Sequence, residues 1–281
     1  LKMPASSTAP SVWPVSRAVP CMPLAAPLDV LLNVLMFALI FVGADRLAVR
    51  EGASTGLALD GLALLGAGLL VGAVHVQRQR KRVAPLFPVD LLRIPVFALS
   101  MGASISAFSA QTLAYLALPF LLLESWGRSH LETGLLITAW PLAIVAMGPV
   151  VARLIGRVPD GVLGGAGMAL LATGLLLLAL LPAGASDASM VVRLALCGVG
   201  FALFQSPNNH TIVSSAPLAR SGAASGMQGT ARLTGQTLGA VLLAGIFSLW
   251  PPQLGHGPLV ALGMAAGCAA LAGVFSALRV R

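Results

Sequence analysis

The sequence has 281 residues, of which 57% are hydrophobic and 9% are charged, and its mean hydropathy is +0.92. Soluble domains carry charge on about a quarter of their residues, so this composition excludes an ordinary water-soluble fold. The net charge of +8 does not indicate a nucleic-acid partner, because the basic residues stand in short segments between apolar runs rather than on one clustered face.

Residues 1–27 contain six prolines and no apolar run long enough for a signal peptide, so we expect an irregular lead-in. Eight apolar runs follow, each near the length of about twenty residues that an α-helix needs to cross the hydrocarbon layer. The first is the weakest, because Asp29 opens it and Asp45 and Arg46 close it. The runs span 28–44, 57–76, 96–123, 134–152, 161–181, 190–213, 223–250 and 258–278. The sequence therefore predicts an all-α integral membrane protein with about eight transmembrane helices.

The distribution of lysine and arginine predicts the orientation, because cytoplasmic loops retain positive charge. With a cytoplasmic N-terminus, 12 of the 17 basic residues fall in inner segments and four in outer ones. The remaining one, Arg232, lies inside the run 223–250. We therefore predict that both termini are cytoplasmic and that the number of spans is even.

The segment 78–95 is the longest predicted cytoplasmic connection, and it is first basic and then broken by prolines. It separates a two-helix unit, 28–77, from a six-helix block, 96–281. Two interpretations stay open, a topology anchor and a jointed linker between units, and they are compatible.

In the run 223–250, Ser225, Gln228, Arg232 and Gln236 recur at spacings of three and four, so they line one helix face. An arginine this deep in a span is costly unless it faces protein, water or a partner. A structural arginine and a role in a solute pathway are the alternatives. We assign the glycines of this run to close helix packing.

Two further runs carry polar residues in mid-span. In the run 190–213, the cytoplasmic half of the predicted helix has polar residues on both sides of Pro207, namely Gln205, Ser206, Asn208, Asn209 and His210. They favour either local repair of the interrupted helix or a gating role. We assign His210 to capping or an interface, because no acidic residue is nearby in sequence.

In the run 96–123, Phe108, Gln111, Thr112 and Tyr115 share one face. Such a stripe suits a cavity for flat, amphipathic or cationic solutes, or interhelical packing. The candidate residues of a substrate pathway are Phe108, Gln111, Tyr115, Gln205, Asn208, Gln228, Arg232 and Gln236.

The sequence predicts no enzyme, cofactor or metal site. The segment Gly222–Gly226 superficially resembles a serine hydrolase loop, but its glycine spacing is wrong and no histidine sits mid-span as a base. No nucleotide-binding motif is present. Two of the three widely separated cysteines lie within apolar runs, where a small side chain packs well, and their spacing matches neither a disulfide framework nor a metal-ligand motif.

Four segments in the same order carry a family resemblance. They are PLFPVDLLRIPVF at 85–97, LPFLLLESWGRSHLETGLLITAWPLAIVAMGPVVARLIGRVP at 118–159, LCGVGFALFQSPNN at 196–209 and RSGAASGMQGTARLTGQTLGA at 220–240. With them the chain resembles the drug:proton antiporters of the major facilitator superfamily that have fourteen membrane helices. The resemblance implies that 28–77 is the extra central helix pair and that 96–281 is the C-terminal six-helix domain.

The resemblance also implies an activity, the export of amphipathic or cationic drug-like solutes in exchange for protons by alternating access, in a multi-pass protein of the bacterial inner membrane. After the run 134–152 the family usually has a Gly-x-Leu-x-Asp-Arg loop. Here its glycine and aspartate are Ala152 and Gly156, while Arg153 and Arg157 are kept as candidate gating residues.

The N-terminal six-helix half that the resemblance implies is not in this sequence, and 96–281 has no mid-span aspartate or glutamate. We therefore expect the missing half or a second chain as a partner, besides the solute, the proton and the lipid bilayer. The alternative is a truncated, non-transporting membrane protein that acts as an assembly or interaction subunit.

Overall fold

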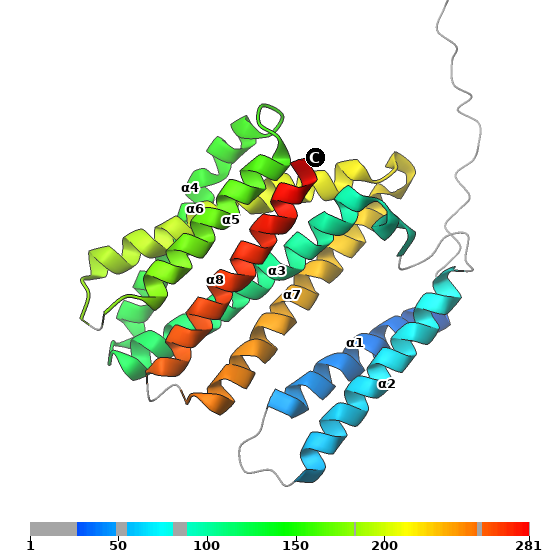
Figure 1. Cartoon of the computed structure of the whole chain (residues 1–281), viewed down its shortest axis with the longest axis horizontal. Coiled ribbons are helices and arrows are strands. Elements are labelled where there is room, and N and C mark those ends of the chain that lie inside the picture. Colours follow the sequence, from blue (N-terminus) through cyan, green and yellow to red (C-terminus); the bar gives the residue numbers. More distant parts are fainter. Residues whose placement is uncertain (1–26, 49–54, 81–88, 183, 252–254, 281) are drawn as a thin grey trace, which may run out of the picture.

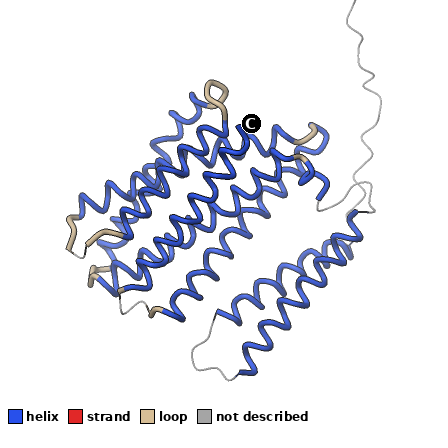
Figure 2. Tube along the Cα trace, viewed as in Figure 1, coloured by secondary structure: helices blue, strands red, loops and turns tan. Residues whose placement is uncertain are grey.

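The computed structural model describes residues 27–48, 55–80, 89–182, 184–251 and 255–280. Most of the predicted lead-in, 1–27, and the centre of the connection 78–95 lie outside these ranges. Within them the chain is helical, with no β-strand, as Figure 2 shows. The long helices are α1 (Pro27–Ala48), α2 (Thr55–Arg80), α3 (Pro95–Phe120), α4 (His130–Leu154), α5 (Asp160–Ala179), α6 (Asp187–Ser215), α7 (Ser221–Leu249) and α8 (His256–Ala277).

Seven helices in the described part, α2 to α8, are long and apolar enough to cross a membrane. They confirm the prediction of a helical integral membrane protein. In α1 the apolar stretch found is shorter, Leu31–Ile40, so an eighth span stays a prediction.

The ends of the helices follow from local sequence chemistry. A capping box begins α4, because the Ser129 hydroxyl accepts from the Glu132 backbone N–H and the Glu132 carboxylate accepts from the Ser129 N–H. Helix α3, which precedes α4, contains Pro119 near its C-terminal end and continues into a π-helical turn, Leu121–Ser125. These local signals place the connection between α3 and α4 at 126–129.

Helix α3 is central to the six-helix block, because it packs against α6, α7 and α8. The block is completed by contacts of α5 with α6 and α8, and of α4 with α6. Helices α1 and α2 pack against each other beside the block, where α1 contacts α7 (Figure 1). The role of this pair as a separate linking unit stays a prediction.

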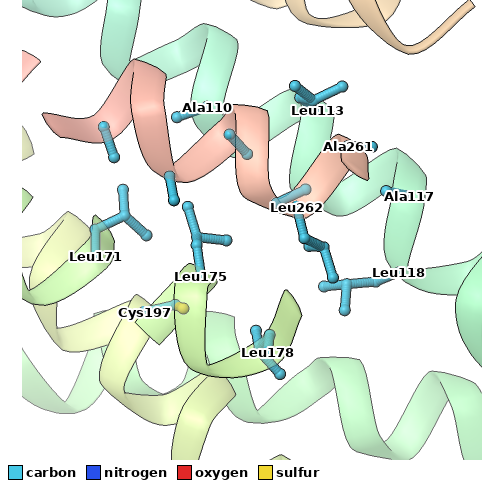
Figure 3. Packing of buried hydrophobic residues seen from close by; sticks show 14 of the residues in the cluster. Ala110, Leu113, Ala117, Leu118, Leu171, Leu175, Leu178, Cys197, Ala261 and Leu262 are labelled. Atoms are coloured by element: carbon cyan, nitrogen blue, oxygen red, sulfur yellow. The ribbon is translucent and has the colours of Figure 1, made fainter. Parts of the chain in front are cut away.

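The core joins α3, α5, α6 and α8 through leucine and alanine side chains. Figure 3 shows Leu171 and Leu175 of α5 close to α8, whose Ala261 and Leu262 lie between α5 and α3. Small residues also bring helix backbones together, because a Cβ atom at Gly167 of α5 would lie 2.5 Å from the carbonyl oxygen of Gly200 in α6. Close approach of this kind is the usual source of helix association in lipid.

Candidate functional site

Arg232 of α7 lies against an aromatic ring of α3. Its guanidinium carbon is 5.4 Å from the ring centroid of Phe108, within the range of a cation–π contact. Phe108 is 4% exposed, whereas the Arg232 side chain is exposed on the side of α7 that the described helices leave uncovered. The structure therefore brings together two candidate pathway residues that are 124 positions apart.

The Phe108 ring also connects α3 to α6. It meets the edge of Phe201 with centroids 5.6 Å apart and an interplanar angle of 75°. Phe201 in turn lies 6.5 Å from Phe204. Phe108 is thus the point at which the aromatic stripe of α3 contacts both other helices that carry candidate residues.

The glutamines of the candidate pathway are half-buried on three helices. Gln228 and Gln236 lie about one turn on either side of Arg232 in α7, and Gln111 lies one turn beyond Phe108 in α3. Gln205 is half-buried on α6. Their roles in a solute pathway stay predictions.

Tyr115, two turns along α3 from Phe108, packs on a different neighbour. Its ring centroid lies 4.8 Å from that of Trp140 in α4, with the planes inclined by 33°. Trp140 is fully buried. The stripe on α3 therefore divides, with Phe108 directed to α6 and α7 and Tyr115 to α4.

Asn208 of α6 belongs to a buried hydrogen-bond network. Its amide nitrogen donates to the Ser104 hydroxyl at 2.7 Å and to the Ser100 carbonyl at 3.4 Å, both in α3. Its amide oxygen accepts from the Arg279 guanidinium at 2.6 Å. With 1% of its surface exposed, Asn208 links helices, and its amide does not repair the helix at Pro207.

Arg279, in the 3-10 turn Leu278–Val280 after α8, joins this network from the C-terminal side. It donates to the Ser100 hydroxyl at 2.9 Å and also to the Ser276 hydroxyl. Burial lowers the pKa of Arg279 to about 10, although the negative charge of Asp160 acts to raise it. The guanidinium is therefore protonated at neutral pH. In the sequence Arg279 is one of the 12 basic residues of the predicted inner segments. No local pattern indicates its hydrogen-bond partners, because they are up to 179 positions away.

His210 meets an acidic residue that is distant in sequence. Its Nδ1 lies 2.7 Å from Oδ2 of Asp160 in the first turn of α5, and Thr211 donates to the same oxygen at 2.9 Å. A carboxylate at this end of a helix is favoured by the helix dipole. His210 therefore lies at an α5–α6 interface, and no signal near it in sequence indicated Asp160.

An ion pair joins the segments before α3 and before α7. Arg220, in the turn Leu218–Arg220, pairs with Asp90 in the turn Val89–Arg93. Nη1 of Arg220 contacts Oδ2 of Asp90, and Nη2 of Arg220 lies 3.2 Å from Oδ1. The hydrogen bond from Arg220 holds the pKa of Asp90 below its ordinary value of 3.8. Both Asp90 and Arg220 belong to segments that carry the family resemblance, 85–97 and 220–240.

The sequence profile described as Major Facilitator Superfamily matches residues 28–240. The chain belongs to the major facilitator superfamily. It is 47% identical over 250 residues to the uncharacterized transporter YebQ of Escherichia coli (strain K12). The matched residues make up 89% of this chain and 53% of YebQ.

Two other relatives carry names that refer to drug resistance or efflux. The multidrug resistance protein Stp of Mycobacterium tuberculosis (strain ATCC 25618 / H37Rv) is 30% identical over 75% of this chain and 40% of its own length. The multidrug efflux pump LfrA of Mycolicibacterium smegmatis (strain ATCC 700084 / mc(2)155) is 28% identical over 72% of this chain and 40% of its own length. The chain thus spans about half or less of the length of these major facilitator relatives.

The connection from α4 to α5 contains a glycine with a positive φ angle. Gly156 stands where the family usually has aspartate, and its φ of 82° lies in the left-handed region that favours glycine. Arg153 and Arg157 on either side are exposed. Their gating role stays a prediction.

Proposed function

We propose that this chain is the C-terminal part of a secondary-active multidrug efflux transporter that exports amphipathic or cationic compounds in exchange for protons. The observation that carries the proposal is membership of the major facilitator superfamily together with 28–30% identity to Stp and LfrA over about three quarters of the chain. Transport makes it a carrier rather than an enzyme.

The geometry around Phe108 supports a pathway along α3, α6 and α7. These helices pack together and present aromatic rings, glutamines and the Arg232 charge. A fixed cation beside the ring repels a cationic solute, so Arg232 orients α7 on α3 or pairs with a carboxylate of a partner half. The half-buried glutamines are the candidates for direct solute contact.

A second half is part of the proposal, because alternating access needs two helical units that rock about a central site. In the described part of α3 to α8 the carboxylates lie at helix ends or in the π-helical turn rather than mid-span, at Glu124, Glu132, Asp160 and Asp187. The coupling proton is therefore assigned to the partner half, in the same polypeptide or in a second chain.

Dye export from cells tests the proposal. The gene product that contains this chain is expressed in bacteria that lack their own major efflux pumps, and ethidium accumulation is followed by fluorescence. We expect lower accumulation than in cells with an empty vector, and a protonophore should abolish the difference. Unchanged accumulation with the protein present in the membrane would contradict drug export.

The alternative is a non-transporting assembly or interaction subunit, and the chain spans about half or less of the length of these relatives. Proteoliposomes that hold this chain alone distinguish the cases. We expect no drug-stimulated proton flux from the chain alone, and flux when an N-terminal six-helix half is added. Persistent absence of flux with that half, together with stable association of the two, would favour the subunit role.

A further inference from the structure

Four elements of the six-helix block meet at one buried polar cluster near the C-terminal end of α8. The cluster comprises Ser100 and Ser104 of α3, Asn208 of α6, Ser276 of α8 and Arg279 in the following turn. The two α3 serines, the asparagine and Ser276 are each at most 1% exposed. Arg279 is the single cation in this group, and it donates to three of the other four side chains.

The chemistry of the cluster requires an arginine. The planar guanidinium presents several donors in a fixed fork, so it can bond the Asn208 oxygen and two serine hydroxyls at once. A lysine ammonium is a compact point charge and cannot reproduce that spread of directions. Without Arg279 the buried Asn208 oxygen would lose its partner, which is costly in a low-dielectric interior.

The cluster adjoins the candidate pathway through the helices themselves. Ser104 precedes Phe108 by one turn of α3, and Asn208 follows Gln205 by one turn of α6. The Asn208–Ser104 hydrogen bond of 2.7 Å therefore fixes the register of the two helices close to these residues. Arg279 holds the other side of the same amide.

We propose that Arg279 is a positioning residue of the transport pathway, which fixes Asn208 against α3 and thereby sets the placement of Gln205 relative to Phe108. This role rests on the proposed transport function. Arg279 does not contact the solute; it acts through Asn208.

The neighbourhood of Arg279 fits this role. Asp160 at the start of α5 supplies an opposite charge that favours the protonated guanidinium. Gly164, one turn further along α5, leaves room for the Ser276 hydroxyl to which Arg279 donates, because a Cβ atom there would overlap that oxygen. Helix α5 thus provides an opposite charge for Arg279 and space for one of its acceptors.

Two measurements on the gene product that contains this chain test the proposal. The first is the rate at which a maleimide labels Gln205→Cys, in a background where Cys21, Cys197 and Cys268 are replaced by alanine. Arg279→Gln should change this rate by about tenfold, as expected for the loss of a hydrogen bond from a charged group. Arg279→Lys should give a smaller change, and the exposed Arg93→Gln serves as the control with no change.

The second measurement is ethidium efflux as a function of dye concentration. Arg279→Gln should raise the apparent KM about tenfold more than it alters the maximal rate per folded molecule. Arg279→Lys should recover part of the KM, and Arg93→Gln should match the wild type. If the Arg279→Gln protein does not fold into the membrane, both measurements are made on Arg279→Lys, because lysine keeps the positive charge and lacks the planar set of guanidinium donors.

The outcomes separate the two proposals. An unchanged labelling rate in the Arg279 variants overturns the positioning role, whether or not dye is exported. A changed labelling rate with a wild-type KM overturns the link to the pathway. If labelling changes but the wild type exports no dye, the positioning of Gln205 stands and the proposed transport function fails.

Discussion

At the scale of single residues, the deep arginine of α7 shows how a costly charge is accommodated. A guanidinium at the centre of a span is unfavourable by about 2.5 to 3.5 kcal/mol on insertion scales. The contact with the Phe108 ring, whose centroid is 5.4 Å from the guanidinium carbon, offsets part of this free energy, since a cation–π contact contributes about 0.5 to 2 kcal/mol. The rest requires water or a partner on the exposed side of α7.

We expect Arg232→Gln to abolish dye efflux while expression and thermal unfolding stay close to wild type, because one face of the side chain is already exposed. Arg232→Lys should retain part of the efflux, since a lysine keeps the cation over Phe108. Efflux and unfolding of the exposed variant Arg46→Gln provide the control. Normal efflux by the glutamine variant would remove the functional role of Arg232.

The Asp90–Arg220 pair predicts an acid-sensitive contribution to stability. The folded-state pKa of Asp90 lies below its ordinary value of 3.8, so the pair stabilises the fold at higher pH. That contribution is lost as the pH falls through and below this value. Between about pH 6 and pH 3, thermal unfolding of the detergent-solubilised protein should therefore shift less for Asp90→Asn than for the wild type. Asp60→Asn, at an exposed position of α2, should shift like the wild type; equal shifts for all three proteins would exclude the effect.

At the scale of helices, the local pattern of the sequence predicts where the helices lie but not which side chains contact one another between helices. Runs of apolar residues predicted each helix of α2 to α8, because crossing the membrane is a property of consecutive residues. The boundaries moved outward where polar caps extend a helix, as in α4, which begins at His130 rather than 134 because of Ser129. The partners of Arg232, His210 and Arg279 come from other helices, so no local pattern could indicate them.

Helix packing between α3 and α7 gives a matched test with two glycines of α7. A Cβ atom at Gly235 would lie 2.5 Å from the carbonyl oxygen of Ile105, whereas no atom of the described residues lies within 4 Å of one at Gly229. Alanine is favoured over glycine in a helix by about 0.5 to 1 kcal/mol, so Gly229→Ala should be neutral or stabilising.

Gly235→Ala should lower the unfolding temperature, because α7 must move away from α3 and the hydrogen bond from Ser109 to the Gly235 carbonyl, 3.0 Å long, is strained. Thermal unfolding of the two variants in the same detergent measures the difference. A Gly235→Ala protein as stable as Gly229→Ala would show that the two helices are not held this closely.

At the scale of the whole molecule, the pairs between oppositely charged or ionisable side chains of the described residues lie at the two ends of the bundle, and the core between α3, α5 and α8 is apolar. The pairs Asp90–Arg220 and Asp160–His210 lie toward the predicted cytoplasmic end. Arg128 and Asp187, 2.6 Å apart, join the connection before α4 to the start of α6 at the opposite end. Charged residues at helix ends stay near water, and the leucine and alanine core between α3, α5 and α8 occupies the hydrocarbon layer.

This arrangement makes the orientation of the whole chain testable. We expect both termini to be cytoplasmic, because the inner segments then hold 12 basic residues and the outer segments four. Single cysteines are placed in 78–93 and in 183–189 of a background without native cysteines, and intact cells are treated with a membrane-impermeant maleimide. The second segment should react in intact cells, and the first should react after the membrane is opened by detergent. Labelling of 78–93 alone in intact cells would reverse the orientation, and it would place the Arg279 cluster and the Asp90–Arg220 pair on the outer side of the membrane.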